Sequence, residues 1–404
     1  MFLDVLQRRN PAFLEAAAAL HQSGAVPANS TVLDLDAIGR NTDRIVAEAR
    51  RLGLTAFAMT KQIGRNPDAC AVIRPHGIPA AVGVDLECAV AAHAAGLRTG
   101  HLGHLVQVPR HRADEGAALA PDYWTVFSVE KAREVGAAAA RAGRVQPVLA
   151  RIVADGDRFY RGHEGGFPAD DVVSVADALD AIDGVRFAGV TSFPTALFDV
   201  ESGTVRTTPN LRTLAAAKVA LEATGRTGVE LNAPGTTSTA MLAMLAEAGA
   251  TQVEPGHGLT GTTPWHAVAD LVEEPAVAYV TEVSHVWAGE AFVFGGGLYV
   301  DPVLGRTPTR ALVVPAGGGL ADARLFDVDM PAPEAIDYYA TIPLEGAPVR
   351  PGDTVLMGFR PQVFVSRSLT VGIAGVGSAP AARPAWSANG ARPLALDDTT
   401  GDVR

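Results

Sequence analysis

The chain has 404 residues with 33 basic and 44 acidic side chains, and its formal net charge of −11 argues against nucleic acid or an anionic membrane as main partner. Hydrophobic residues make up 48% and charged residues 19%, which excludes a disordered chain and predicts a core large enough for two domains. No apolar run approaches the ~18 residues of a membrane span, and no signal-like segment opens the chain. Two cysteines exclude a disulfide framework, so we expect a cytoplasmic protein.

The first 30 residues precede the repeating part of the chain. Apolar residues along one stripe predict a single amphipathic helix over residues 1–24, followed by a lead-in to residue 30. A short strand over residues 31–35 and a helix over residues 36–52 are then expected to open the first large domain.

Between residues 31 and 273, apolar strands alternate with alanine-rich helices. We expect eight strands, at residues 55–61, 80–85, 98–105, 123–128, 146–154, 185–192, 228–233 and 251–254. Strands that alternate with helices pair in parallel, and eight of them over roughly 200 residues indicate a closed (β/α)8 barrel of the TIM type. A doubly wound open sheet is the alternative, but no glycine fingerprint follows the first strand.

The pattern changes after the barrel. Residues 274–378 contain strand-like segments separated by glycine- and proline-rich turns, which predict a C-terminal all-β domain. Residues 379–404 alternate small and polar residues in short runs and are predicted to form a flexible tail.

Lys61 ends the first barrel strand. It follows an apolar run, and Gly64, Asn66 and Pro67 come directly after it. An ammonium group at the end of a buried strand loses solvation, which lowers its pKa towards the neutral amine. A neutral amine can form a Schiff base with a carbonyl compound, whereas the alternative interpretation is a lysine that only extends from the strand to solvent.

Two turns rich in glycine and hydroxyl groups follow the seventh and eighth strands, at residues 232–238 and 254–258. In a barrel of this kind the site is built from the C-terminal ends of the strands, and neighbouring glycine turns at the last two strands commonly bind phosphate. Ordinary turn chemistry explains either turn alone. The pair together favours a phosphate site.

The lysine, the phosphate turns and the acid Glu254 form one constellation, which fits pyridoxal 5′-phosphate. Lys61 would hold the aldehyde, the turns the phosphate, and the carboxylate would face the pyridine nitrogen. The residues expected to bind the cofactor are Lys61, Arg161, His163, Asn232, Gly235, Thr236, Thr237, Glu254, Gly256 and His257. No metal site is predicted, because histidines scattered on loops are more typical of polar lining than of metal ligands.

Four segments together resemble one enzyme family, and they are residues 32–41, 101–107, 160–162 and 254–256. The family is that of the alanine racemase-like, or fold type III, pyridoxal-phosphate enzymes, and the chain is most similar to a subgroup labelled only alanine racemase-like. The resemblance covers about residues 30–375. It implies that residues 160–162 take the place of an asparagine–arginine pair that meets the substrate, and that Glu254 pairs with the pyridinium, as in the decarboxylase branch.

Two departures from the family pattern bear on the reaction. Phe294 stands where racemases of this family supply a tyrosine base from the partner subunit, and a phenyl ring cannot move a proton. Tyr299 and His285 are near in sequence and are the candidates for this second base. The cysteine motif of the decarboxylases and the His-x-Cys metal pair of zinc-dependent D-serine dehydratases are absent from residues 350–368, where Arg360, Pro361 and Gln362 stand instead.

The sequence therefore predicts a pyridoxal-phosphate enzyme that acts at the α-carbon of an amino acid, and a racemase or epimerase is favoured. The resemblance implies a homodimer whose sites are completed by the partner's β domain, with Val293 and Phe294 buried between the subunits. A D-amino-acid lyase or a decarboxylase of the same fold is the first alternative. A non-catalytic pyridoxal-phosphate-binding protein is another, and a phosphate-binding barrel without this cofactor would leave Lys61 unexplained.

Overall fold

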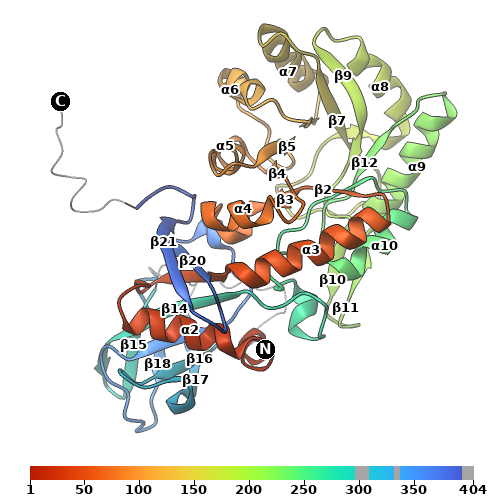
Figure 1. The fold of residues 1–404 in the computed structure, drawn as a ribbon. Helices are drawn as coiled ribbons and strands as arrows, with labels where there is room; N and C mark the ends of the chain where they lie inside the picture. Colours follow the sequence, from red (N-terminus) through yellow and green to blue (C-terminus); the bar gives the residue numbers. More distant parts are fainter. Residues whose placement is uncertain (296–308, 332–336, 394–404) are drawn as a thin grey trace, which may run out of the picture.

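The computed structural model describes residues 1–295, 309–331 and 337–393. Two domains lie one above the other, with the barrel in the upper half of Figure 1 and the β domain in the lower half. Helix α3, Leu35–Arg51, runs from one domain to the other. Among the sequence predictions, the position of Tyr299 falls outside the described residues.

The upper domain is the predicted (β/α)8 barrel, and its parallel strands follow the sequence order around the sheet. The strands are β2 Thr55–Ala56, β3 Ala58–Met59, β4 Ala80–Gly83, β5 Arg98–Leu102, β6 Tyr123–Val126, β7 Gln146–Val153, β9 Val185–Thr191, β12 Glu230–Asn232 and β13 Gln252–Val253. β2 and β3 are two parts of the segment 55–59. β2 pairs with the last barrel strand, β13, and β3 pairs with β4, so this segment closes the barrel. The expected strand 55–61 is therefore too long, because residues 60–63 form the 3-10 turn η1, Thr60–Ile63.

Helices cover the outside of the barrel. After α3 they are α4 Pro67–Ile73, α5 Leu86–Ala94, α6 Ala113–Ala118, α7 Val129–Arg141, α8 Val172–Asp180, α9 Pro209–Ala223 and α10 Thr239–Glu247. Side-chain caps fix several of the starts: Asp34 accepts from the Ala37 amide, Asn66 from the Ala69 amide and Asp85 from the Cys88 amide.

The barrel domain also contains short elements outside the strand–helix repeat. They are β8 Phe167–Pro168, the hairpin of β10 Ala196–Asp199 with β11 Thr204–Thr207, and the 3-10 turns η2 Arg110–Arg112, η3 Ala169–Asp171 and η4 Pro264–Ala267. The hairpin interrupts the expected strand–helix alternation between β9 and α9. It packs beside the glycine turn that follows β12, because the Thr236 amide donates to the Ala196 carbonyl at 2.9 Å.

The β domain has one main sheet in the order β17-β16-β19-β14-β1-β20-β21, and β15 and β18 continue from β14. Its strands are β1 Ser30–Asp34, β14 Val277–Trp287, β15 Glu290–Phe294, β16 Thr309–Val314, β17 Arg324–Val328, β18 Tyr339–Pro343, β19 Thr354–Met357, β20 Leu369–Ala374 and β21 Ala381–Ser387. Two 3-10 turns, η6 Leu320–Asp322 and η7 Val363–Val365, lie in the connections.

Two sequence expectations about this sheet are wrong. The strand near residue 31 was counted with the barrel, but β1 pairs antiparallel with β14 and parallel with β20 in the centre of the β sheet. The segment after residue 379 was expected to be loose, but β21 pairs with β20, and the Trp386 indole donates to Asp68 at 2.8 Å. Both strands find their partners far away in the sequence, where local patterns give no signal.

The N-terminal segment forms two helices instead of the single expected one. They are α1 Phe2–Arg9 and α2 Pro11–Gln22. Proline at the start of α2 lacks the amide that would continue α1, so the chain bends at Asn10. Leu6, Phe13 and Leu14 pack against Val280 and Leu356, and the two helices thereby cover one face of the β sheet.

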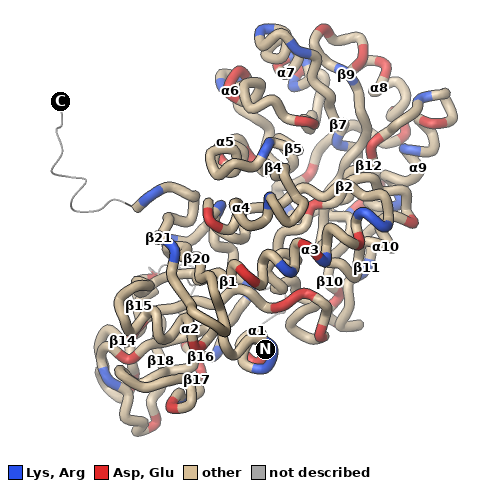
Figure 2. The backbone as a smooth tube through the Cα atoms, in the orientation of Figure 1, with Lys and Arg blue, Asp and Glu red and all other residues tan. Residues whose placement is uncertain are grey.

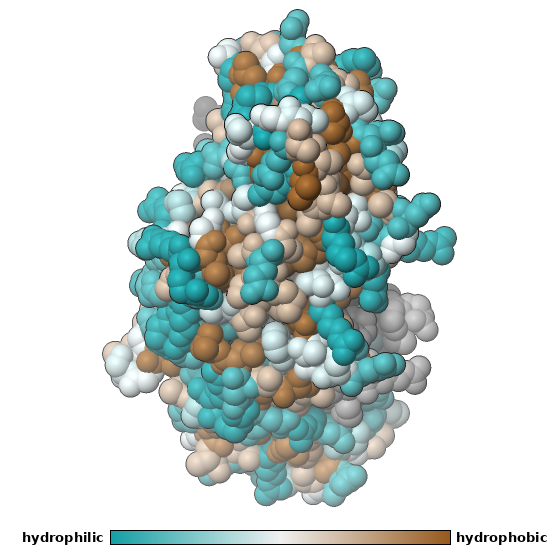
Figure 3. Space-filling view, turned by 90° about the vertical axis from the view of Figure 1, so that its right-hand side faces the viewer, coloured by the Kyte–Doolittle hydropathy of each residue, from teal (hydrophilic) through white to brown (hydrophobic). Residues whose placement is uncertain are grey.

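The surface carries no single dominant feature in the views shown. Acidic and basic residues are spread over both domains (Figure 2), and hydrophobic residues are scattered among hydrophilic ones on the face in Figure 3. None of the helices in the described ranges combines the length and apolar composition needed to span a bilayer.

Candidate active site

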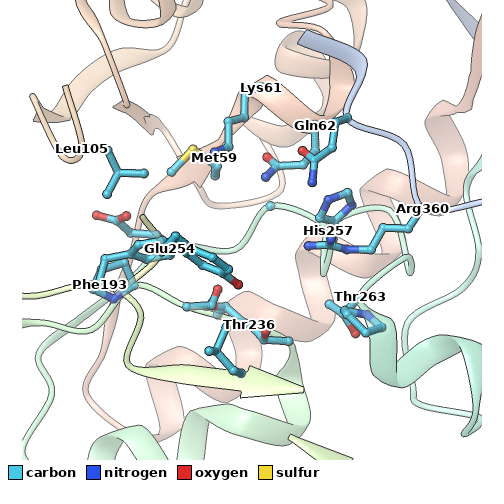
Figure 4. A pocket seen from close by; sticks show the side chains of 18 of the residues that line it. Met59, Lys61, Gln62, Leu105, Phe193, Thr236, Glu254, His257, Thr263 and Arg360 are labelled. Atoms are coloured by element: carbon cyan, nitrogen blue, oxygen red, sulfur yellow. The ribbon is translucent and has the colours of Figure 1, made fainter. Parts of the chain in front are cut away.

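A cavity of about 560 Å³ opens at the C-terminal end of the barrel strands, and a loop of the β domain closes one side of it. Figure 4 shows Lys61 and Glu254 reaching it from the barrel and Arg360 from the β domain. Of the residues expected to bind the cofactor, those that line the cavity are Lys61, His163, Gly235, Thr236, Thr237, Glu254, Gly256 and His257.

Lys61 lies in the η1 turn that immediately follows the first barrel strand. Gly64 ends this turn in the left-handed conformation, with φ of 60°, and a Cβ there would come within 2.6 Å of Thr370 in the β domain. The lysine Nζ lies 5.1 Å from the centre of the Phe364 ring. Burial lowers the pKa of Lys61 and the Arg360 charge lowers it further, whereas Cys88, Asp85 and Glu254 act in the opposite direction.

Glu254 is a fully buried carboxylate that follows β13. His101 Nδ1 lies 2.5 Å from its Oε1, and the Asn232 amide donates to the same oxygen at 2.9 Å. Burial alone would raise the pKa of Glu254, but the charges of His104 and His101 and these hydrogen bonds lower it below its ordinary value. Its other oxygen, Oε2, makes no hydrogen bond among the described residues and lies 3.5 Å from His104 Nδ1, and the residue lines the cavity.

The two histidines next to Glu254, His101 and His104, differ in their hydrogen bonds. His101 is held from both sides, since its Nε2 lies 2.5 Å from the Thr125 hydroxyl. Burial lowers the pKa of His104 to about 3, so this ring is neutral near pH 7. Ligand atoms of His101, His104 and Glu254 lie within 4.8 Å of one another, a spacing that could hold a metal ion, but the short His101–Glu254 distance is that of a direct hydrogen bond.

The two glycine turns pack closely against their surroundings. A Cβ on Gly235 would lie 2.7 Å from the Ala196 amide nitrogen, and one on Gly256 would lie 2.7 Å from Gln62 Oε1. Only some backbone amides of these turns are available to a phosphate. The Thr236 amide donates to the Ala196 carbonyl, whereas the amides of Thr237 and His257 meet no acceptor among the described residues. Buried His257 Nε2 and Gln62 Oε1 also have no hydrogen-bond partner there, so the cavity wall offers polar atoms to a ligand.

Three expected site residues lie elsewhere in this chain. Arg161 is exposed and does not line the cavity, where its neighbour Tyr160 does. Asn232 lies beneath Glu254 and orients it. His285 is exposed on β14 and stacks on Phe292 with ring centres 4.4 Å apart, away from the cavity of its own chain.

The structure adds residues that sequence reasoning did not assign to the site. Arg360, Gln362 and Phe364 follow β19 in the β domain and line the cavity opposite the barrel turns. The only sequence signal is that residues 360–362 stand where relatives carry a metal pair. Nothing in the local pattern shows that this loop reaches a lysine some 300 positions earlier.

Comparisons with known proteins agree with this architecture. The family model described as alanine racemase, N-terminal domain, matches residues 33–264, and the model described as YhfX-like, C-terminal domain, matches residues 278–382. The chain is 38% identical over 377 residues to the Escherichia coli K12 protein entitled "Uncharacterized protein YhfX", covering 93% of this chain and 95% of that protein.

Solved structures show the same fold at low sequence identity. D-threonine aldolase from Filomicrobium marinum is 18% identical with a TM-score of 0.65, covering 90% of this chain and 95% of the other. D-threo-3-hydroxyaspartate dehydratase from Delftia sp. HT23 is 18% identical with a TM-score of 0.64 (91% and 98% covered). Alanine racemase from Clostridium difficile 630 is 14% identical with a TM-score of 0.63 (90% and 99% covered). The chain therefore belongs to the family defined by the alanine racemase N-terminal domain, and in this chain a YhfX-like C-terminal domain follows the barrel.

Proposed function

We propose that the protein is a pyridoxal-phosphate-dependent enzyme that acts at the α-carbon of an amino acid, and within this class an amino-acid racemase or epimerase. The proposal is carried by one observation: Lys61, the carboxylate of Glu254 and the two glycine turns face a single cavity. The unpartnered Glu254 Oε2 and His257 Nε2, and turns too tight for any Cβ, fit a cofactor that carries both a ring nitrogen and a phosphate.

Bound pyridoxal phosphate would supply an electron sink for the negative charge that develops when the α-proton leaves. Lys61 would hold the aldehyde carbon, and its lowered pKa makes the unprotonated amine, which can take a proton, more abundant than in an ordinary lysine. Glu254, oriented by His101 and Asn232, would keep a proton on the ring nitrogen. The amides of Thr237 and His257 would hold the phosphate.

Racemisation needs a second proton donor on the opposite face of the cofactor. Phe294 cannot serve, so we propose Tyr299 of a second subunit, with His285 as the second choice. The expected observation is solvent deuterium incorporation at the α-carbon from both enantiomers of a substrate amino acid, reduced in Tyr299→Phe.

A D-amino-acid lyase or a decarboxylase is the second candidate. The phenyl ring of Phe294 favours it, because one-sided chemistry, in which protons move on a single face of the cofactor, needs no base on the opposite face. If only one enantiomer exchanges its α-proton with solvent in the wild-type protein, one-sided chemistry replaces racemisation. If neither enantiomer of any amino acid exchanges although the cofactor is bound, the protein is a pyridoxal-phosphate carrier instead.

A further inference from the structure

Arg360 reaches the cavity from a loop whose position is fixed by contacts with the lysine turn. The loop leaves β19 and passes through η7, which packs on η1. A Cβ on Gly64 would come within 2.9 Å of Val363 in η7, and Phe364 lies beneath the Lys61 amine. The guanidinium is thus carried by the β domain to the place where the barrel presents its lysine.

The cavity has a negative side chain at one end and a positive side chain at the other. Among the described residues that line it, the acidic, lysine and arginine side chains are Lys61, Glu254 and Arg360. Glu254 is engaged with His101 and Asn232 at one end, and Figure 4 shows Arg360 beside His257 at the other. The positive charge of Arg360 lowers the pKa of both His257 and Lys61, so it acts on the second glycine turn and on the lysine alike.

An arginine at such a place suits an oxyanion. Its planar guanidinium presents parallel N–H donors that match the oxygens of a phosphate or a carboxylate, and partial burial strengthens the attraction. The neighbouring His257 amide and the unpartnered His257 Nε2 would complete the set of polar groups around the same anion.

We propose that Arg360 is the residue through which the β domain binds an oxyanion of the ligand in the cavity, either the phosphate of pyridoxal phosphate or the carboxylate of the amino acid. This inference rests on the proposed function. It makes ligand binding a property of both domains, because the anion would connect the turns of the barrel to the loop after β19.

The test compares ligands with and without each anion, using Arg360→Gln and Arg360→Lys. Cofactor-free protein is titrated with pyridoxal phosphate and with pyridoxal, which lacks the phosphate, and binding is followed by absorbance. Cofactor-loaded protein is titrated with L- and D-alanine and with ethylamine, which lacks the carboxylate. Arg367→Gln is the matched control, since this arginine on the same connection is exposed and pairs with Asp337 at 2.6 Å.

If Arg360 binds the phosphate, Arg360→Gln weakens pyridoxal phosphate by roughly 10- to 100-fold, the scale of one charge-assisted interaction, and weakens pyridoxal far less. If it binds the carboxylate, Arg360→Gln weakens alanine to a similar degree and leaves ethylamine unchanged. In either case the affinity of Arg360→Lys, which keeps the charge without the planar guanidinium, lies between those of the wild type and Arg360→Gln. The affinity of Arg367→Gln matches that of the wild type.

Three results would overturn the inference. Unchanged affinity for all five ligands in Arg360→Gln removes Arg360 from ligand binding, while the proposed function survives. Equal losses for each ligand and its anion-free counterpart assign the residue to loop structure only. Failure of the wild-type protein to bind pyridoxal phosphate overturns the proposed function and this inference together.

Discussion

Glu254 is fully buried, and two hydrogen bonds, from His101 and Asn232, hold one of its oxygens, while the residue lines the cavity. Glu254→Gln keeps the shape of the side chain but removes the negative charge that we propose to face the ring nitrogen. We expect proton abstraction from the α-carbon to slow by ~10²-fold or more, the scale of losing one well-placed electrostatic partner.

The measurement for Glu254 is the rate of α-proton exchange with solvent at saturating amino acid and cofactor. Glu230→Gln is the matched control. Glu230 is the first residue of β12 and does not line the cavity, and its carboxylate accepts hydrogen bonds from the hydroxyls of Tyr123 and Thr251. Unchanged exchange in Glu254→Gln would show that this carboxylate only supports the end of the strand.

The lowered pKa of Lys61 predicts a pH dependence. A lysine loses its proton as pH rises through its pKa, so the reactive neutral amine should accumulate at lower pH than for an ordinary lysine of pKa 10.5. The rate at which cofactor-free protein combines with pyridoxal phosphate should rise with pH and level off below that value. Arg360→Gln should move the midpoint upward, since it removes a charge that lowers this pKa. A wild-type midpoint at or above that of a free lysine would contradict the burial of the amine.

Individual site residues differ in how far the sequence predicts them. Lys61 and Glu254 are predictable because each follows an apolar strand directly, and parallel strands of a barrel bring such ends together. The sequence predicts Asn232 at the cofactor, but its side chain donates to Glu254 instead. A shift of one residue along a strand changes which neighbour a side chain meets, and the sequence does not fix that position. Arg360 could not be placed, since its position depends on packing between domains.

At the scale of elements, the turn after β12 is fixed by close contact with the hairpin strand β10. Gly235→Ala would bring a Cβ within 2.8 Å of both the amide nitrogen and the carbonyl oxygen of Ala196, which backbone atoms cannot easily avoid. We expect a loss of about 1–3 kcal/mol in the free energy of unfolding and weaker binding of pyridoxal phosphate.

Denaturant unfolding and absorbance titration measure the two effects of Gly235→Ala. The comparison is Gly319→Ala in the β domain, where an added Cβ would meet only the flexible end of Glu15 at 3.2 Å. Wild-type cofactor affinity in Gly235→Ala would mean that this turn does not shape the phosphate site.

The barrel strands are the part of the fold that the sequence predicts best. Their apolar runs are separated by alanine-rich helices, and apart from the closing pair β2–β13 each strand pairs with the barrel strand before or after it in sequence. β1 and β21 are harder, because β1 joins β14 and β20 across more than 240 residues and β21 has only exposed and half-buried residues, with no buried face. Their partners are selected by the finished sheet and not by the local pattern.

At the scale of the whole molecule, one outward face of the β domain is aromatic. Phe292 and Phe294 alternate with buried Ala291 and Val293 on β15, and Tyr339 lies 5.8 Å from Phe294. Val293 is completely buried in the core of its own domain, so the expectation that it lies between subunits is wrong; only Phe294 of that pair is available. We propose that this aromatic face is the contact between two subunits.

Light scattering should report a dimer, and Phe294→Asp should shift it towards the monomer because a charge would be buried in the contact. Leu325→Asp, at an exposed apolar residue on β17, should leave the mass unchanged. A wild-type monomer at working concentrations would contradict the proposed assembly and the shared second base.

The most direct test of a lysine-bound pyridoxal phosphate is the absorbance spectrum of the purified protein after incubation with the cofactor and removal of the excess. Wild-type protein should retain a band near the visible edge. Borohydride should abolish this band, because reduction of the C=N bond leaves the cofactor attached to Lys61 through a stable secondary amine. Lys61→Ala should retain no such band and show no α-proton exchange. A wild-type protein that stays colourless after this incubation would contradict the assignment of the cavity to pyridoxal phosphate.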